Sequence, residues 1–252
     1  MKSLSIQSRI YLILTYIAGA LLLLLNLWDI KFTEPVIFLI LCILGSILHI
    51  LKVEGATKRS HYTFSFLIFG FAILFLDPSL ALTVIILSNI AEWAWNRPPW
   101  FIQLFNISCY IISAQVAILI YQSFNAQGGF TSWEVILAIS LAMIGFTLVN
   151  HMLVGVILWL ARGEGFKQSG IFDLIPISID LIMLTLGASL VFICNYNPYA
   201  LLFFLAPLYP IYMSMKIPSL ERKTETDQKT GLFNHNYFME QLKNELHRAN
   251  RF

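Results

Sequence analysis

Residues 133–160 read WEVILAISLAMIGFTLVNHMLVGVILWL, an apolar run whose only ionisable side chains are Glu134 and His151. A helix crosses a hydrocarbon core of about 30 Å with about 20 apolar residues. This run is longer than that, so it predicts a membrane-spanning helix that tilts or projects beyond the bilayer.

Comparable runs occur on both sides of this stretch, and together they predict eight membrane-spanning helices. The predicted spans are 10–28, 33–51, 62–76, 79–95, 100–122, 133–160, 171–193 and 198–215. Asp77-Pro78-Ser79 separates the third span from the fourth, and proline makes a helix break there the expected outcome. Residues 62–95 therefore form either two short helices or a re-entrant hairpin.

The composition of the whole chain agrees with a membrane protein. Hydrophobic residues make up 58%, charged residues 12%, and the mean hydropathy is +0.75. Soluble domains are about 45–50% apolar and about 25% charged, so a soluble globule, a disordered chain and a disulfide scaffold are excluded. The net charge of +2 gives no indication of nucleic-acid binding. The expected fold class is all-α: a polytopic membrane bundle of about eight transmembrane helices with a short cytoplasmic helical tail.

Lysine and arginine are shared unevenly between the two sides that eight crossings would create. One side holds Lys2, Arg9, Lys52, Lys58, Arg59, Arg97, Arg162 and Lys167, and the other holds Lys31. Basic residues accumulate in cytoplasmic loops. We therefore expect a multi-pass protein of the cell's inner (plasma) membrane with both termini in the cytoplasm.

Charged residues become frequent after Lys216, which indicates a change from membrane to water. A helix from Asn236 toward Arg251 is predicted, and Phe238, Leu242 and Leu246 form an apolar stripe along it. An isolated helix of about 15 residues is marginal in water. This stripe is therefore expected to require another domain or subunit.

Residues 227–238 read DQKTGLFNHNYF, and this stretch resembles the opening of a GGDEF domain, the catalytic domain of bacterial diguanylate cyclases. The positions that match the opening pattern are Asp227, Thr230, Gly231, Leu232, Asn234 and Phe238. Lys229 stands where the family has leucine, and His235-Asn236 replace its arginine pair. In the family this opening is a structural turn and not a catalytic site.

The resemblance implies three parts: a transmembrane sensory domain, 1–215, a signalling linker helix, 216–227, and the N-terminal fragment of a GGDEF domain, 228–252. It also implies a homodimer, because two such domains meet to make cyclic di-GMP from two GTP. Mg²⁺ and GTP are implied for a catalytic part beyond residue 252. Within this chain the sequence offers no catalytic residue, no metal-ligand spacing and no cofactor site, so the chain alone is expected to be inactive.

Polar side chains inside the predicted spans are the candidate ligand-binding residues, because such groups are costly in lipid. They are Asn150, His151, Asp180 and Glu92. His151 and Asp180 each lie nine residues from the cytoplasmic ends of consecutive helices, which usually pack as neighbours. We therefore predict that they pair, with Asn150 or Ser178 nearby. The pair is either a ligand or proton site, since histidine titrates near neutral pH, or a bond that only holds the bundle together.

Glu92 and the histidines near the first loops have simpler explanations than ligand binding. Glu92 lies about one turn from a cytoplasmic helix end, where solvation or a weak ion pair with Arg97 is the simpler expectation. His49 and His61 lie near a loop and are isolated, so neither is assigned a role.

Three functions are compatible with these features. The first is the signal-input region of a diguanylate cyclase-type protein that responds to an unidentified small molecule. The second is a transporter-like or substrate-binding membrane subunit, because broken helices and mid-membrane polar groups also occur in transporters. The third is a structural membrane anchor.

Overall fold

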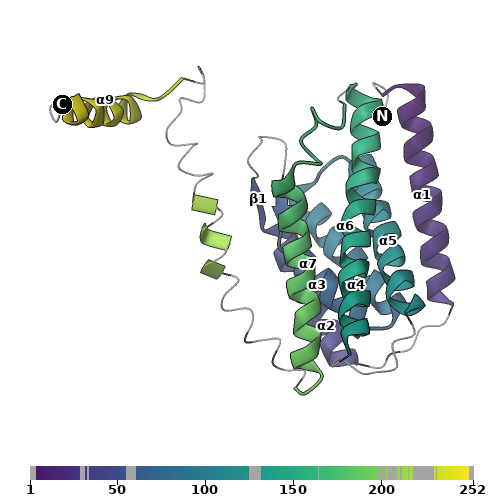
Figure 1. The fold of residues 1–252 in the computed structure, drawn as a ribbon. Coiled ribbons are helices and arrows are strands. Elements are labelled where there is room, and N and C mark those ends of the chain that lie inside the picture. The colour runs from purple at the N-terminus through teal and green to yellow at the C-terminus, as the bar shows by residue number, and fades with distance from the viewer. Residues whose placement is uncertain are drawn as a thin grey trace.

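The computed structural model describes residues 4–28, 32, 34–54, 61–124, 132–163, 165–197, 230 and 232–249, together with 200, 203, 209–210, 212–214 and 216–217. Within these residues, helices α1 to α7 form a bundle that carries one short β-hairpin, and helix α9 follows near the C-terminus of the sequence (Figure 1). The described part of the chain is therefore all-helical apart from that hairpin.

The seven bundle helices correspond to the first seven predicted spans. They are α1 (Ile6–Leu27), α2 (Pro35–Ile50), α3 (Ser65–Phe75), α4 (Pro78–Asn96), α5 (Trp100–Ser123), α6 (Trp133–Arg162) and α7 (Leu174–Cys194). Five of them, α1 and α4 to α7, are long and apolar enough to cross a membrane, which marks the chain as a membrane protein. The eighth predicted span, 198–215, falls mostly outside the described residues.

Helix α3 occupies the centre of the bundle. Every residue from Ser65 to Ile73 is buried, as expected for a helix that is apolar on all sides. With 11 residues it is about 16 Å long at 1.5 Å per residue, which is about half the thickness of the hydrocarbon core. The predicted span 62–76 is thus wrong at its start, since residues 61–63 form a strand and the helix begins at Ser65.

The break predicted at Asp77-Pro78 is confirmed. Helix α3 ends at Phe75, and α4 begins with Pro78 in its first turn, where the missing N–H of proline costs nothing. Residues 62–95 therefore contain two separate helices. Figure 1 shows both inside the bundle, behind α6 and α7 in this view.

Two glycines allow α3 and α7 to approach closely. A Cβ atom on Gly70 would collide with the carbonyl oxygen of Leu184, and one on Gly187 would collide with the carbonyl oxygen of Leu67. Small residues at such crossings let helix backbones touch, which is a main source of helix association in membranes. The central helix is therefore held against α7 by backbone-to-backbone packing.

A hairpin joins α2 to α3. Strand β1 (Lys52–Glu54) pairs with antiparallel strand β2 (His61–Thr63), and Lys52 stands opposite Thr63. The hairpin begins two residues after the end of α2 and finishes two residues before α3. It therefore places Lys52 and Thr63 at the same end of the bundle as the C-terminal turns of α2 and α4.

The structure describes only part of the predicted linker and of the predicted GGDEF fragment. Apart from Lys216 and Ile217, the predicted linker 216–227 lies outside the described residues, as does Asp227 of the motif. Helix α9 (His235–Ala249) lies within the predicted fragment 228–252.

Candidate functional site

The bundle contains a buried pair of ionisable side chains on α6 and α7. His151 Nε2 lies 3.0 Å from Asp180 Oδ2, and the two side chains are 4% and 15% exposed. The prediction that these residues pair across consecutive helices is confirmed. Ser178, which was expected as a possible neighbour, is exposed.

The hydrogen bonds of His151 determine how many protons the pair holds. Its Nδ1 lies 2.6 Å from the carbonyl oxygen of Ile171; a carbonyl only accepts, so Nδ1 carries a hydrogen and donates it. Nε2 then faces Asp180 with one proton between them, bound either to the ring or to the carboxyl group. The pair is electrically neutral in both forms, as a charge pair buried away from water should be.

Aromatic side chains from the segment between α6 and α7 cover this pair. The Phe172 ring lies 6.2 Å from the imidazole of His151, and Phe166 packs edge-on against Phe172 at 5.4 Å. Gly155 on α6 lies beneath them, and a Cβ there would come within 2.8 Å of Phe166 and 2.9 Å of Phe172. The absence of a side chain at Gly155 thus lets the two rings close over the pair.

Asn150, which precedes His151 in the sequence, is also buried. Its side chain makes no hydrogen bond to His151 or Asp180. Its amide oxygen has no hydrogen-bond partner within the described part of the chain. A buried acceptor without a donor is destabilising by about 1–3 kcal/mol. Asn150 is therefore a group that an added hydrogen-bond donor would satisfy.

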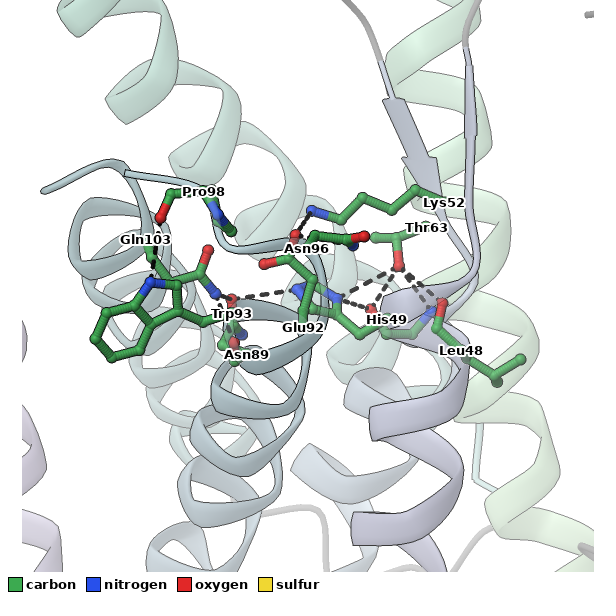
Figure 2. Close-up of polar contacts among 11 residues, drawn as sticks. Leu48, His49, Lys52, Thr63, Asn89, Glu92, Trp93, Asn96, Pro98 and Gln103 are labelled. Atoms are coloured by element: carbon green, nitrogen blue, oxygen red, sulfur yellow. Dashed lines mark hydrogen bonds and ion pairs between the residues drawn. The ribbon is translucent and has the colours of Figure 1, made fainter. Parts of the chain in front are cut away.

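A second polar cluster, which the sequence reasoning missed, surrounds His49 (Figure 2). We call it the His49 network; its members are His49 from α2, Thr63 from β2, Ser65 from α3, Asn89 from α4 and Gln103 from α5. All five side chains are buried. The network thus joins four helices and the hairpin at one end of the bundle.

The geometry of the network assigns the state of its histidine. Asn89 Nδ2 donates to the carbonyl oxygen of Ile85 at 2.8 Å, which leaves Asn89 Oδ1 as the acceptor 3.2 Å from His49 Nε2. His49 Nε2 therefore carries a hydrogen, and Nδ1 can accept from Ser65 Oγ at 2.7 Å. Thr63 Oγ1 in turn lies 2.9 Å from Ser65 Oγ. A neutral His49 satisfies every one of these contacts.

Gln103 completes the network from the side of α5. Its Nε2 donates to the main-chain oxygen of Asn89 at 2.6 Å. The other atom of the amide, Oε1, is buried and has no partner among the described residues. Gln103 therefore anchors α5 to α4 but leaves one acceptor unused.

Glu92 lies beside this network and not beside His151. Its Oε1 pairs with Lys52 Nζ at 2.8 Å and also lies 3.4 Å from Asn96 Nδ2. The expectation that Glu92 is solvated or pairs with Arg97 is wrong: its side chain is 4% exposed and its ion-pair partner is Lys52 of the hairpin. Arg97 instead caps α4 in a left-handed conformation.

One spacing could have indicated this cluster from the sequence. His49 and Lys52 are three residues apart, and so are Asn89 and Glu92. Residues three apart share one face of a helix. Asn89 and Glu92 do share a face of α4, whereas α2 ends at Ile50 and Lys52 reaches Glu92 from strand β1.

The motif in the tail makes local contacts that are typical of a turn and a helix cap. Asn234 Oδ1 accepts from the main-chain N–H of Tyr237 at 2.9 Å, the standard N-cap interaction. Thr230 Oγ1 accepts from the N–H of Leu232 at 3.4 Å. Leu232 and Phe238 are exposed, while Asp227 and Gly231 lie outside the described residues.

Comparison with protein-family models, with curated proteins and with solved structures finds no match to this chain. Within the described ranges, no cluster of three or more histidine, cysteine, aspartate or glutamate side chains could hold a metal ion. Cys42, Cys109 and Cys194 are free and buried, consistent with small apolar side chains. The candidate sites are therefore the His151–Asp180 pair and the His49 network with Glu92.

Proposed function

We propose that this chain is the membrane signal-input region of a diguanylate cyclase-type protein, in which the bundle controls a GGDEF output that begins after residue 227. The sequence motif is the main support. The contacts of Thr230 and Asn234 are consistent with it, because both residues shape the backbone and neither is free for catalysis.

Helix α9 gives the second support. Phe238, Leu242 and Leu246 are 57%, 43% and 57% exposed, so the stripe predicted from the sequence lacks full cover in the described part of the chain. An amphipathic helix gains most of its stability by packing this face. A cytoplasmic output domain that starts with α9 would supply that packing, and dimerisation would bring two such outputs together.

The His151–Asp180 pair is the proposed site at which the signal acts. It joins α6 to α7, and α7 is the last helix of the bundle within the described residues. A ligand that accepts the hydrogen of His151 or donates to Asn150 would favour one arrangement of these helices. The signal can shift the equilibrium only by the difference between its affinities for the two arrangements.

The test is a chimera in which residues 1–252 precede the catalytic remainder of an active diguanylate cyclase, expressed in a bacterial strain without other cyclases. Cyclic di-GMP is measured by mass spectrometry at matched membrane levels. We expect the chimera to be active and His151→Asn to change the product level by about 5-fold, within the usual range of coupling between sites. Ser178→Ala, at an exposed position two residues before Asp180, serves as the matched control.

Two results would contradict the proposal. The first is a membrane-inserted chimera that makes no cyclic di-GMP although the same catalytic part is active behind its own input domain. The second is an identical product level in the chimera, in His151→Asn and in a version without residues 4–197.

A transporter-like or substrate-binding subunit is the second candidate function. The observation that favours it is the discontinuity between α3 and α4: α3 is too short to cross a membrane and stops inside the bundle. Transporters use such interrupted helices to build binding sites. Uptake of protons or solutes by sealed vesicles that contain the purified chain, compared with empty vesicles, separates this function from signal input.

A further inference from the structure

A sharp turn joins α4 to α5, and an exposed arginine lies at its start. Arg97 has a φ of 49° and caps α4 in the left-handed conformation, with its N–H donating to the carbonyl oxygen of Trp93 at 3.0 Å. Among the described residues it is the only non-glycine residue with a positive φ. Helices that end in this conformation usually have glycine or asparagine there. An arginine at this position therefore carries a backbone strain that glycine would avoid.

The turn after Arg97 is held in a fixed shape. Pro98 and Pro99 follow it, and the proline ring fixes the φ angle of each. The indole Nε1 of Trp93 donates to the carbonyl oxygen of Pro98 at 3.1 Å, as Figure 2 shows. Helix α5 then begins at Trp100. Backbone strain at a rigid, exposed turn is a reason to look for a function of the side chain.

Three exposed tryptophans lie close to Arg97 in the chain. Trp93, Trp95 and Trp100 are 44%, 74% and 55% exposed. Tryptophan accumulates at the boundary between membrane and water, where its ring lies among the lipid headgroups. The turn is therefore expected to lie at the depth of the headgroups, with Arg97 beside the lipid phosphates.

The same end of the bundle gathers further basic residues. Ser5 Oγ donates to the carbonyl oxygen of Leu160 at 3.4 Å, and the Tyr16 hydroxyl donates to that of Phe101 at 2.7 Å. The start of α1 therefore lies beside the end of α6 and the start of α5 (Figure 1). The described charged residues of this end are the basic Arg9, Lys52, Arg97, Arg162 and Lys167 and the acidic Glu92 and Asp173.

The opposite end of the bundle has the opposite charge. Its described residues include Glu34, Asp77 and Glu134 and contain no lysine or arginine. At the basic end, the carboxylate of Glu92 is already paired with Lys52. Within the described part of the chain Arg97 makes no ion pair. Its guanidinium is therefore available to an anion that comes from the membrane.

We propose that Arg97 and the three tryptophans form a binding site for the headgroup of an anionic phospholipid. A planar guanidinium can donate to two phosphate oxygens at once, while the indole rings contact the boundary region of the same lipid. A zwitterionic headgroup places a cationic group beside its phosphate, so an anionic headgroup suits a basic end better. Anionic lipids of the cytoplasmic leaflet attract basic residues near the membrane surface. This inference goes beyond the proposed function and does not depend on it.

The experiment measures the quenching of tryptophan fluorescence by brominated lipids in phosphatidylcholine nanodiscs that hold the full chain. Trp28, Trp133 and Trp159 are replaced by phenylalanine, so that the emission comes from the three tryptophans of the site. Brominated phosphatidylglycerol is compared with brominated phosphatidylcholine at equal mole fractions. We expect an about 5-fold preference for the anionic lipid, the size expected for one basic residue at an anionic surface, and a smaller preference at high salt.

Arg97→Gly is the most informative variant, because glycine adopts a positive φ without strain. We expect it to lose the preference for phosphatidylglycerol while its resistance to unfolding in neutral mixed micelles increases. Lys167→Gln, which removes an exposed basic residue between α6 and α7, is the matched control and should keep the preference. Each variant is first checked for wild-type helix content by circular dichroism.

Three results would overturn the proposal. The first is a preference that persists in Arg97→Gly, since general attraction to the basic end would then explain it. The second is a lower resistance to unfolding in Arg97→Gly, which would show that the arginine serves the fold. The third is relief of the quenching by inorganic phosphate at constant ionic strength, because the site would then bind a free anion and not a lipid.

Discussion

His49 and His151 are buried histidines of one bundle, but their rings face different kinds of atom. His49 has the Ser65 hydroxyl at one ring nitrogen and an amide oxygen at the other. His151 has a main-chain carbonyl at one and the carboxyl group of Asp180 at the other. A hydroxyl donates as well as accepts, so His49 is satisfied while neutral, whereas the two acceptors around His151 require one additional, shared proton. The bonded atoms, and not burial, therefore decide which of the two histidines shares a proton with a carboxyl group.

Removing the carboxyl group of Asp180 should have the largest effect on the free energy of unfolding. Asp180→Leu leaves the imidazole of His151 buried without its charge partner, and breaking such a pair costs about 3–5 kcal/mol. We expect a loss of about 3 kcal/mol in the free energy of unfolding, measured by titration with sodium dodecyl sulfate in mixed micelles. Unchanged stability would mean that the pair does not hold α6 to α7.

Removing both His151 and Asp180 should lower the free energy of unfolding less than removing the carboxyl group of Asp180 alone. In the double variant His151→Leu and Asp180→Leu, no unpaired charge remains, and apolar replacements of a buried pair are often neutral or stabilising. We expect most of the loss seen in Asp180→Leu to be recovered in the same titration. A double variant as unstable as the single one would contradict a mainly electrostatic role for the pair.

The network around His49 should respond less strongly to the loss of one member. Ser65→Ala removes the nearer hydroxyl donor from His49 Nδ1 at 2.7 Å and leaves Thr63 Oγ1 at 3.4 Å as its partner, which costs about 1–2 kcal/mol. The measurement is the same unfolding titration. A loss as large as that of Asp180→Leu would show that the two histidines are not distinguished by their partners.

The smallest effect is expected next to the pair but outside it. Ser178 lies two residues before Asp180 and is exposed, so Ser178→Ala should change the unfolding free energy by less than about 0.5 kcal/mol. A larger loss would indicate that Ser178 contacts the pair. The sequence predicted that either Asn150 or Ser178 would lie near it.

The two sites differ in how far the sequence could predict them. His151 and Asp180 could be paired by counting residues from the ends of consecutive helices, because a short connection forces such helices to run side by side. The His49 network could not be reached in this way, since it joins α2, β2, α3, α4 and α5. His49 and Asn89 are 40 residues apart in the chain, and no count along one helix relates them.

Glu92 illustrates a second limit of prediction from the sequence. Its position near a helix end indicates solvent, and Arg97 is the nearest basic residue along the chain. The fold instead brings Lys52 of the hairpin to its carboxylate and buries the other oxygen. The solvent exposure of a residue near a helix end depends on which segments pack against it, and these segments can be distant in the sequence.

The sequence by itself determined that this chain is a membrane protein built from helices, because the length of an apolar run is a direct measure of what can cross a bilayer. It also determined the break before α4, since proline and its preceding residue disfavour a continuing helix wherever they occur. The tertiary structure alone decided that α3 is a short central helix, that Gly70 and Gly187 lie at its crossing with α7, and that His49 and Glu92 share one end of the bundle. Those outcomes depend on close contacts between segments far apart in the chain, and one-dimensional patterns of hydropathy carry no information about them.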